Sequence, residues 1–355
     1  MKSIYYIFTS LLLLSSCASI QAPTGGDKDV NAPELLSKKI NSTSTKTTEN
    51  TTIEFNFNEF IQLNKIENYF YTSPPFKKRA RLKVKQTTLL ITIEDTLLEN
   101  TTYNIVLDNC IKDNNEGNVL DTLNYIFSTA ETIQDSLSIK GNLRDAYTLK
   151  PIDNAWVMLY DTLTVDSLIF KDNPNYVAKS NKNGYFNFPN LNNKYYRVVA
   201  LTGSDFVYDE KEQIAFYNNS ICALKDSAIT LNCFNPLIET DSLIIDTTST
   251  LKNDSTILAE VPCGKLTISS NKLEGPLLFQ LLQNNKIMHE YIIETGPYTL
   301  ININPGKYQL KCIFDANYDA KWNTGDWELR KQAETVINYP AEITIRSNWD
   351  MELLW

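Results

Sequence analysis

The residue pattern best suited to chemistry lies near the C-terminus, between 315 and 326. Acidic and amide side chains alternate there in the D-x-[DN]-x-[DN] order that opens many calcium loops, and oxygen atoms are the ligands that Ca²⁺ prefers. The expected ligands are Asp315, Asn317, Asp319 and Asp326. The loop departs from an EF-hand, because Ala320 replaces the glycine and no glutamate closes it. A structural loop built on Asx turns is the competing interpretation. Calcium is the only cofactor that the sequence suggests.

Histidine chemistry is nearly excluded, because His289 is the single histidine. It lies in an alternating apolar run, which predicts a half-exposed position on a strand. The sequence contains no G-x-S-x-G elbow, P-loop or G-x-G-x-x-G motif. The expectation is therefore a protein that is not an enzyme. An envelope hydrolase is a weaker alternative, and it would need a cleft with convergent carboxylates.

One cysteine carries a different chemistry, at the N-terminus. Lys2 precedes a short apolar run at 4–14, followed by Leu14-Ser15-Ser16-Cys17. The run is shorter than the roughly 20 residues of a transmembrane helix, so it predicts a secretory signal at 1–16. The Cys17 environment resembles a bacterial lipobox, which implies thioether lipidation of Cys17 and a lipid-anchored tether at 17–28. No acidic cluster follows Cys17, which favours the periplasmic face of the outer membrane over surface exposure.

The other five cysteines are Cys110, Cys222, Cys233, Cys263 and Cys312. An odd number cannot all pair within one chain. An exported protein meets an oxidising compartment, where Cys222 and Cys233 could close a short loop. Five small buried residues inside strands are the other interpretation.

Aspartate is followed unusually often by Ser or Thr and then a small or aliphatic residue, at nine of the 22 aspartates. The triplet resembles an O-glycosylation signal of Gram-negative envelope proteins, although Asp-Ser and Asp-Thr pairs also make turns. The candidate acceptors are Ser242, Thr247, Ser255, Ser136, Thr162 and Ser167.

The elements that must position these residues are strands. Apolar alternation recurs about every ten residues from Thr52 to Phe127, with turn residues between, which is typical of a β-sandwich. The segments 57–61, 73–75, 95–103, 111–118 and 127–129 together resemble the SbsA-type bacterial Ig-like domain, assigned to 29–130. That resemblance implies a structural or spacer role without catalysis.

A second domain is expected at 136–235, with Asn183-Gly184 as a hairpin turn. It resembles the carboxypeptidase regulatory-like, transthyretin-like family, which implies a seven-stranded sandwich without an active site. A Ser-, Thr- and Asp-rich linker follows at 236–262. The third domain, 263–355, repeats features of the second: the run from Tyr196 matches the run from Tyr308.

The sequence thus predicts an all-β protein of tandem β-sandwich domains behind a lipoprotein signal peptide. A net charge of -9 argues against binding to nucleic acid. The expected function is a non-catalytic envelope lipoprotein, a structural or interaction module. Its expected partners are the membrane, through the lipid, and envelope proteins or glycans. A glycan-binding or calcium-stabilised adhesion protein is the alternative.

Overall fold

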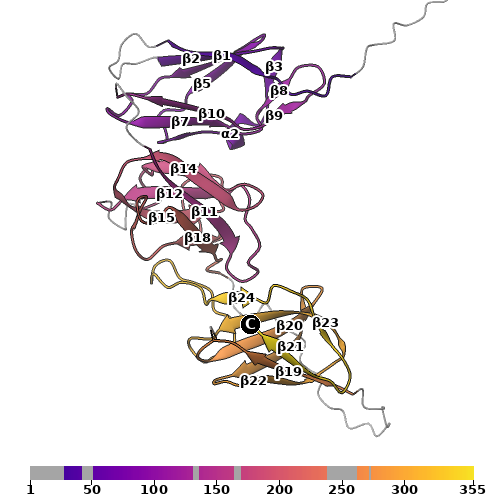
Figure 1. The fold of residues 1–355 in the computed structure, drawn as a ribbon. Coiled ribbons are helices and arrows are strands. Elements are labelled where there is room, and N and C mark those ends of the chain that lie inside the picture. Colours follow the sequence, from indigo (N-terminus) through magenta and orange to yellow (C-terminus); the bar gives the residue numbers. More distant parts are fainter. Residues whose placement is uncertain (1–27, 42–50, 131–135, 164–168, 238–261, 272) are drawn as a thin grey trace, which may run out of the picture.

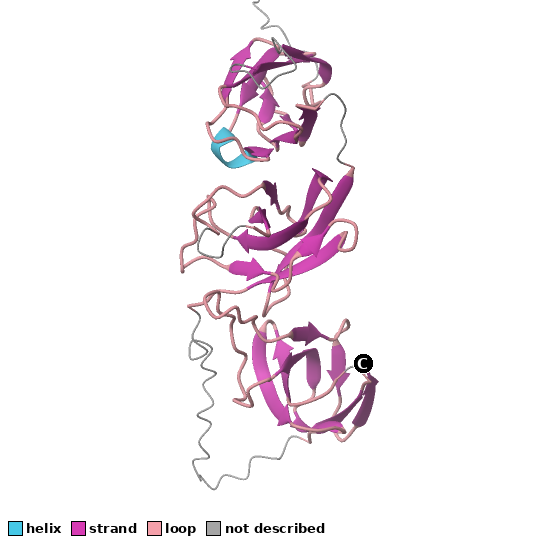
Figure 2. Ribbon diagram, turned by 90° about the vertical axis from the view of Figure 1, so that its left-hand side faces the viewer, coloured by secondary structure: helices cyan, strands magenta, loops and turns pink. Residues whose placement is uncertain are grey.

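The computed structural model describes residues 28–41, 51–130, 136–163, 169–237, 262–271 and 273–355. These residues form three β-sandwiches in a row (Figure 1; Figure 2). The all-β prediction is confirmed, with a single four-residue helix among the described residues. The expected signal peptide, Cys17 and nearly all of the expected tether and linker lie outside this part of the chain.

Two main sheets form the first sandwich. One has the order β1-β2-β6-β5 and the other β10-β7-β4, while β3-β8-β9 is a small side sheet. The elements are β1 (Leu35–Asn41), β2 (Thr51–Phe57), β3 (Ile61–Leu63), α2 (Ile66–Tyr69), β4 (Phe70–Ser73), β5 (Arg81–Lys85), β6 (Thr88–Ile93), β7 (Thr102–Leu107), β8 (Ile111–Asp113), β9 (Val119–Leu120) and β10 (Leu123–Ser128). Alternate residues of β2, such as Ile53 and Phe55, point into the core, as the sequence pattern predicts.

Basic and apolar residues alternate from Arg79 to Lys85, and the last five of these residues form the edge strand β5. Arg81, Lys83 and Lys85 are exposed, while Leu82 and Val84 pack against the core. Charged side chains on an edge strand oppose pairing with another chain. The run therefore works as a solvated edge.

The second sandwich joins the sheet β14-β11-β18 to the sheet β13-β12-β15-β16, with β17 also on β15. Its strands are β11 (Leu137–Asp145), β12 (Trp156–Asp161), β13 (Tyr176–Lys179), β14 (Tyr185–Leu191), β15 (Tyr195–Leu201), β16 (Ile214–Phe216), β17 (Ile221–Cys222) and β18 (Ala228–Cys233).

The third sandwich has the sheets β22-β19-β26 and β21-β20-β23-β24, with β25 on β23. Its strands are β19 (Gly264–Ser269), β20 (Leu277–Gln283), β21 (Lys286–Ile293), β22 (Tyr298–Ile303), β23 (Gly306–Phe314), β24 (Val336–Asn338), β25 (Ile343–Ile345) and β26 (Asp350–Leu354).

The second and third sandwiches share one topology, as the internal repeat predicts. Each strand of one has a counterpart in the other, including the parallel pairs β11–β18 and β19–β26. In each domain two short strands lie one after the other along the same edge, β16 and β17 on β15, and β24 and β25 on β23. The eight strands of each domain therefore occupy seven positions.

The second and third sandwiches also share a core. One apolar cluster combines Met158, Tyr160, Phe170, Phe216 and Phe234 of the second with Leu278, Ile313, Trp322 and Val336 of the third. Apolar surface buried between domains resists their separation. The two sandwiches are therefore expected to move as one unit.

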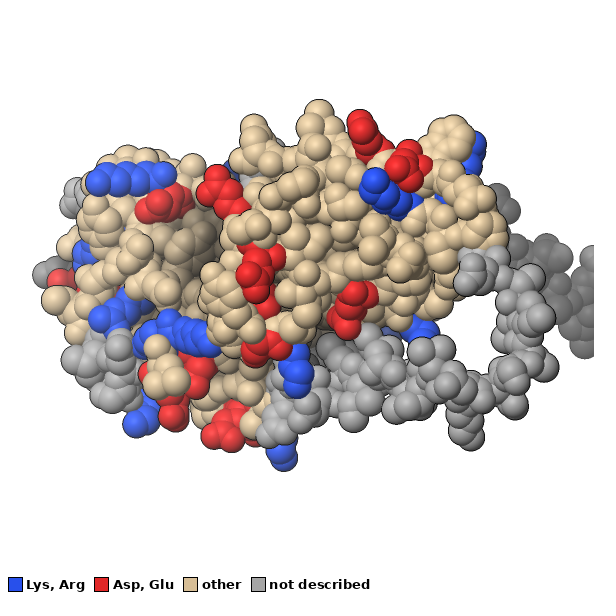
Figure 3. Space-filling view, turned by 90° about the horizontal axis from the view of Figure 1, so that it is seen from below, with Lys and Arg blue, Asp and Glu red and all other residues tan. Residues whose placement is uncertain are grey.

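One face of the molecule carries few charged side chains. Acidic and basic side chains are interspersed on the face seen from below, and much of that face is uncharged (Figure 3). Over the part of the chain that the structure covers, no helix combines the length and apolar character needed to cross a membrane.

Candidate functional site

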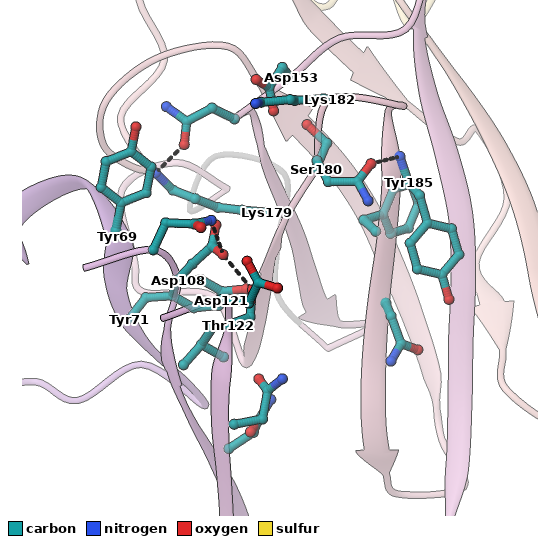
Figure 4. A pocket seen from close by; sticks show the side chains of 18 of the residues that line it. Tyr69, Tyr71, Asp108, Asp121, Thr122, Asp153, Lys179, Ser180, Lys182 and Tyr185 are labelled. Carbon is teal, nitrogen blue, oxygen red and sulfur yellow. Dashed lines mark hydrogen bonds between the residues drawn. The ribbon is translucent and has the colours of Figure 1, made fainter. Parts of the chain in front are cut away.

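A polar cleft of about 960 Å³ lies between the first and second sandwiches (Figure 4). Both domains line it, the first from β4, β7, β10 and neighbouring turns, the second from β13, β14 and the turn between them. Clefts between domains are a preferred place for binding sites, and their volumes typically reach 300–1,000 Å³. This cleft is therefore the candidate functional site.

The first wall is the outer face of the sheet that contains β7. Tyr103, Ile105 and Leu107 of this strand point into the first core. Asn104 and Val106 point the opposite way and are nevertheless buried, because β14 of the second sandwich lies against β7. A strand buried on both faces indicates a cover on its outer side. Here that cover is the next domain.

The second wall is formed by the turn between β13 and β14, including the predicted Asn183-Gly184 turn. Gly184 has a φ of 72°, and its amide donates to the Asn181 carbonyl over 2.7 Å. The Asn181 side-chain oxygen accepts from the amides of Asn183 and Tyr185, each at 3.0 Å. The hairpin prediction is wrong in its strand pairing, because β13 pairs with β12 and β14 pairs with β11 in a different sheet, although the turn itself forms. The turn places amide groups and the Tyr185 ring at the cleft.

Trp156 joins the two sandwiches beside the cleft. Its ring meets the edge of Tyr71, from the first sandwich, at 5.4 Å between centroids. Burial raises the pKa of Tyr71 to about 12, although a hydrogen bond to the Lys179 backbone acts to lower it. A second contact between the domains is the Val177 amide, which donates to Ser73 Oγ over 3.0 Å. These contacts fix the junction on one side of the cleft.

Lys179 brings a cation into the cleft from the second sandwich (Figure 4). Its Nζ lies 4.4 Å from the centre of the Trp156 ring and donates to Asn154 Oδ1 over 2.9 Å. Burial lowers the pKa of Lys179, while the carboxylates of Asp108 and Asp153 act in the opposite direction. The ammonium is thus held close to acidic groups of both domains.

Asn104 has a buried acceptor that the protein leaves unused. The residue is 9% exposed, and its Oδ1 is among the few buried side-chain oxygens of the described chain without a hydrogen-bond partner. A buried polar atom without a partner costs about 1–3 kcal/mol. Because Asn104 lines the cleft, a bound donor would recover that cost.

The predicted calcium loop uses its oxygens differently. The Asp315 carboxylate is buried and accepts the amides of Asp319 at 3.1 Å and Ala320 at 2.8 Å. Asp319 Oδ2 accepts from the side-chain amides of Asn317 and Asn323, each at 2.9 Å. Among the described residues, no group of three His, Cys, Asp or Glu side chains could hold a metal ion. Asp315, Asp319 and Asp326 thus form no such group, and the hydrogen bonds of the loop fit the Asx-turn interpretation. Calcium binding at Asp315, Asn317, Asp319 and Asp326 stays a prediction.

The same loop docks the third sandwich onto the second. Trp327 packs against Phe170 at 5.1 Å and Phe216 at 5.2 Å, both from the second sandwich. The ring centre of Trp322 lies 5.1 Å from that of Tyr147, which also belongs to the second sandwich. Apolar rings mixed into a polar loop are the sequence signal that indicates this docking.

Cys222 and Cys233 are both free thiols, so the suggested Cys222–Cys233 disulfide is absent. Cys233 is fully buried at the end of β18, and burial raises the pKa of its thiol. Cys222 lies next to Asn193, with the sulfur 3.4 Å from its side-chain oxygen. The interpretation of small buried residues applies to four of the five, while Cys263 is partly exposed.

His289 lies on β21 at a half-buried position, as predicted. Burial lowers the pKa of His289, and its neighbours are the rings of Tyr291 and Tyr308. Of the proposed modification sites, Ser136 is exposed and Thr162 is partly buried. Ser167, Ser242, Thr247 and Ser255 lie outside the described residues, as does Cys17.

Comparison with known proteins identifies the first sandwich. Residues 29–129 match the family model of the bacterial Ig-like domain, Big_5. This confirms the Ig-like part of the resemblance. No curated protein sequence matches the chain.

Solved structures with distant similarity include two pilins and a protease. The minor pilin GBS52 of Streptococcus agalactiae shows 12% identity and a TM-score of 0.20, covering 62% of this chain and 94% of its own. The major pilin BcpA of Bacillus cereus shows 12% identity and a TM-score of 0.20, and the match covers 57% of this chain and 70% of the pilin chain. Fervidolysin from Fervidobacterium pennivorans, a keratinolytic enzyme related to subtilisin, shows 9% identity and a TM-score of 0.22, and the match covers 57% of this chain. The match spans only 28% of fervidolysin. Scores this low carry no inference about function.

Proposed function

We propose that the protein is a non-catalytic, lipid-anchored module of a bacterial cell envelope. In this proposal, Cys17 holds the chain at the periplasmic face of the outer membrane. The three sandwiches then place an interaction surface at a distance from the lipid. The second and third sandwiches belong, in this proposal, to the carboxypeptidase regulatory-like, transthyretin-like class. The shared seven-position topology supports that assignment.

The observation that carries the proposal is the way the domains are joined. An Ig-like domain is followed by two sandwiches with a common apolar core, and its own junction is packed by Tyr71 and Trp156. Apolar junctions hold neighbouring domains in a fixed arrangement. Such a chain suits a spacer that presents a site, and the cleft between the first two sandwiches is the site it would present.

The anchor is tested by fractionating cells that express the full chain or its Cys17→Ala variant. We expect the unaltered chain in the outer membrane, with an intact mass that includes the lipid, and the variant in the soluble fraction. Cys263→Ala is the matched control, because Cys263 is partly exposed in the third sandwich and should leave the anchor unchanged. An unaltered chain that is soluble and carries no lipid would contradict the anchor.

The same mass measurement tests the proposed O-glycans. Sugar increments on the unaltered chain should decrease when Ser242, Thr247 and Ser255 are replaced by Ala. A mass explained by polypeptide and lipid alone would remove the glycan proposal and leave the anchor standing.

A further inference from the structure

We propose that the cleft between the first and second sandwiches binds an uncharged carbohydrate. This inference rests on the proposed role as an interaction module and names the class of ligand. It is argued from the side chains that line the cleft, from their charge balance, from an exposed ring and from the unused acceptor on Asn104.

Asparagine dominates the lining. Both domains contribute, and the set comprises Asn64, Asn104, Asn109, Asn124, Asn154, Asn181, Asn183 and Asn187. Each side-chain amide offers donors and an acceptor side by side. A sugar hydroxyl both donates and accepts, so a surface rich in amides matches a polyhydroxylated ligand better than it matches an apolar one.

The charges in the cleft balance. Three aspartates, Asp108, Asp121 and Asp153, face three lysines, Lys65, Lys179 and Lys182. Several of these groups already have partners: Lys179 donates to Asn154, and Asp108 accepts from Asn109 over 2.8 Å and from Thr122. A polyanion would meet three carboxylates and a polycation three ammonium groups, and like charges repel at short range. The balance therefore favours a neutral ligand.

Tyr185 supplies an exposed aromatic surface in the second wall. It is 40% exposed although it lies on a strand of the sandwich (Figure 4). Tyrosine combines an apolar face with a polar tip. The C–H groups of a sugar ring can pack on such a face while the hydroxyls reach the neighbouring amides.

The acceptor on Asn104 is the observation that points most directly to a ligand. Asn104 lines the cleft, and its Oδ1 is buried and has no partner in the protein. After a rotation of the Asn104 side chain, a hydroxyl of the ligand would donate to this oxygen. Because Asn104 lies on the Ig-like domain and Tyr185 on the next, one ligand would contact both domains.

The test is calorimetric titration of the full chain, purified from membranes in a detergent without a sugar headgroup. The probes are four neutral trisaccharides: cellotriose, maltotriose, mannotriose and N,N′,N″-triacetylchitotriose. We expect at least one to bind. Tyr185→Ala should weaken that binding at least about tenfold. Tyr195→Ala is the matched control, because Tyr195 is 48% exposed on β15 and does not line the cleft.

Asn104→Leu provides a second variant with a distinct signature. Replacing an unpaired buried acceptor by an apolar group of similar size should leave the melting temperature unchanged or raise it. Binding should nevertheless weaken about tenfold, because the ligand hydroxyl loses its acceptor. A variant that had simply unfolded would lose both the melting transition and the binding of the sugar.

Three results would overturn the proposal. One is no binding of any trisaccharide at concentrations up to about 5 mM. Another is binding that Tyr185→Ala and Asn104→Leu leave unchanged. The third is preference for heparin oligosaccharide or triasparagine peptide over every neutral sugar. The anchor is measured separately with Cys17→Ala, so failure here and failure of the envelope role are distinguishable.

Discussion

Tyr196 and Tyr308 make the same hydrogen bond in two different sandwiches. Each hydroxyl donates to a backbone carbonyl four residues upstream, Tyr196 to Asn192 over 3.2 Å and Tyr308 to Asn304 over 2.9 Å. Both rings are 2% exposed and lie on counterpart strands, β15 and β23. This tyrosine corner pins the turn that leads into the strand. The second and third sandwiches therefore share a specific hydrogen bond as well as their strand order.

The corner predicts matched losses of stability. Tyr196→Phe and Tyr308→Phe each remove one partly buried hydrogen bond, so we expect each to lower the free energy of unfolding by about 1 kcal/mol. Urea unfolding followed by circular dichroism measures this. Tyr217→Phe is the control, because Tyr217 is 38% exposed. Losses as small as that of the control would show that the corner adds nothing to stability.

Trp327 is expected to couple the second and third sandwiches. Its ring packs on Phe170 and Phe216, and the Arg330 guanidinium lies 3.5 Å from its centre. Trp327→Ala removes these contacts and should lower the free energy of unfolding by about 3 kcal/mol. Because the cost falls on the junction, calorimetry should then resolve separate transitions for the two sandwiches.

Trp349→Ala serves as the control for Trp327. Trp349 is 56% exposed, and its ring lies 5.5 Å from the Arg346 guanidinium. It should lower stability by less than about 1 kcal/mol. An equal effect of the two substitutions, with a single transition in both, would contradict the coupling role of Trp327.

Lys311 should make stability depend on alkaline pH. Its Nζ is buried at the junction, 3.5 Å from the centre of the Tyr147 ring, and donates to the Tyr147 carbonyl over 2.9 Å. Burial lowers the pKa of Lys311 to about 8, with Asp145 acting to raise it and Lys150 to lower it. Between that value and the ordinary 10.5, the unfolded chain binds more protons than the folded one. Stability contributed by this group therefore rises with pH in that window.

The measurement is urea unfolding of the unaltered chain and Lys311→Met between pH 7 and 9.5. Because Met cannot titrate, the free energy of unfolding of the unaltered chain should rise by about 2 kcal/mol relative to that of the variant over this pH range. The comparison cancels groups common to both proteins. Two curves that stay parallel would show that Lys311 keeps an ordinary pKa.

Much of the fold follows from local patterns. Alternation in segments such as 52–57 predicts strands because side chains on a strand point alternately to its two faces. The Asn183-Gly184 turn was predictable because glycine accepts a positive φ. The repeat of the third domain was visible through Tyr196 and Tyr308, whose hydrogen bonds constrain the residue type.

The site was less predictable, because its parts come from different domains. Asn104 and Tyr185 are far apart in the sequence, and nothing local indicates that β14 covers β7. The one available signal was the apolar and amide run of β7, which is buried on both faces. The Asp315 loop shows how ambiguous local spacing is, since oxygens at calcium-like spacing also accept hydrogen bonds from backbone amides of the same loop.

The parallel pairing of β11 with β18 has a mechanical consequence. The chain enters the second sandwich at the start of β11 and leaves it at the end of β18, and these strands run side by side from Lys140–Ala228 to Asp145–Cys233. Tension between the first and third domains would slide the two strands past each other, so it loads their hydrogen bonds together rather than one at a time. We expect this domain to resist stretching strongly, and single-molecule force spectroscopy would measure the rupture force. A low force would show that the chain yields elsewhere.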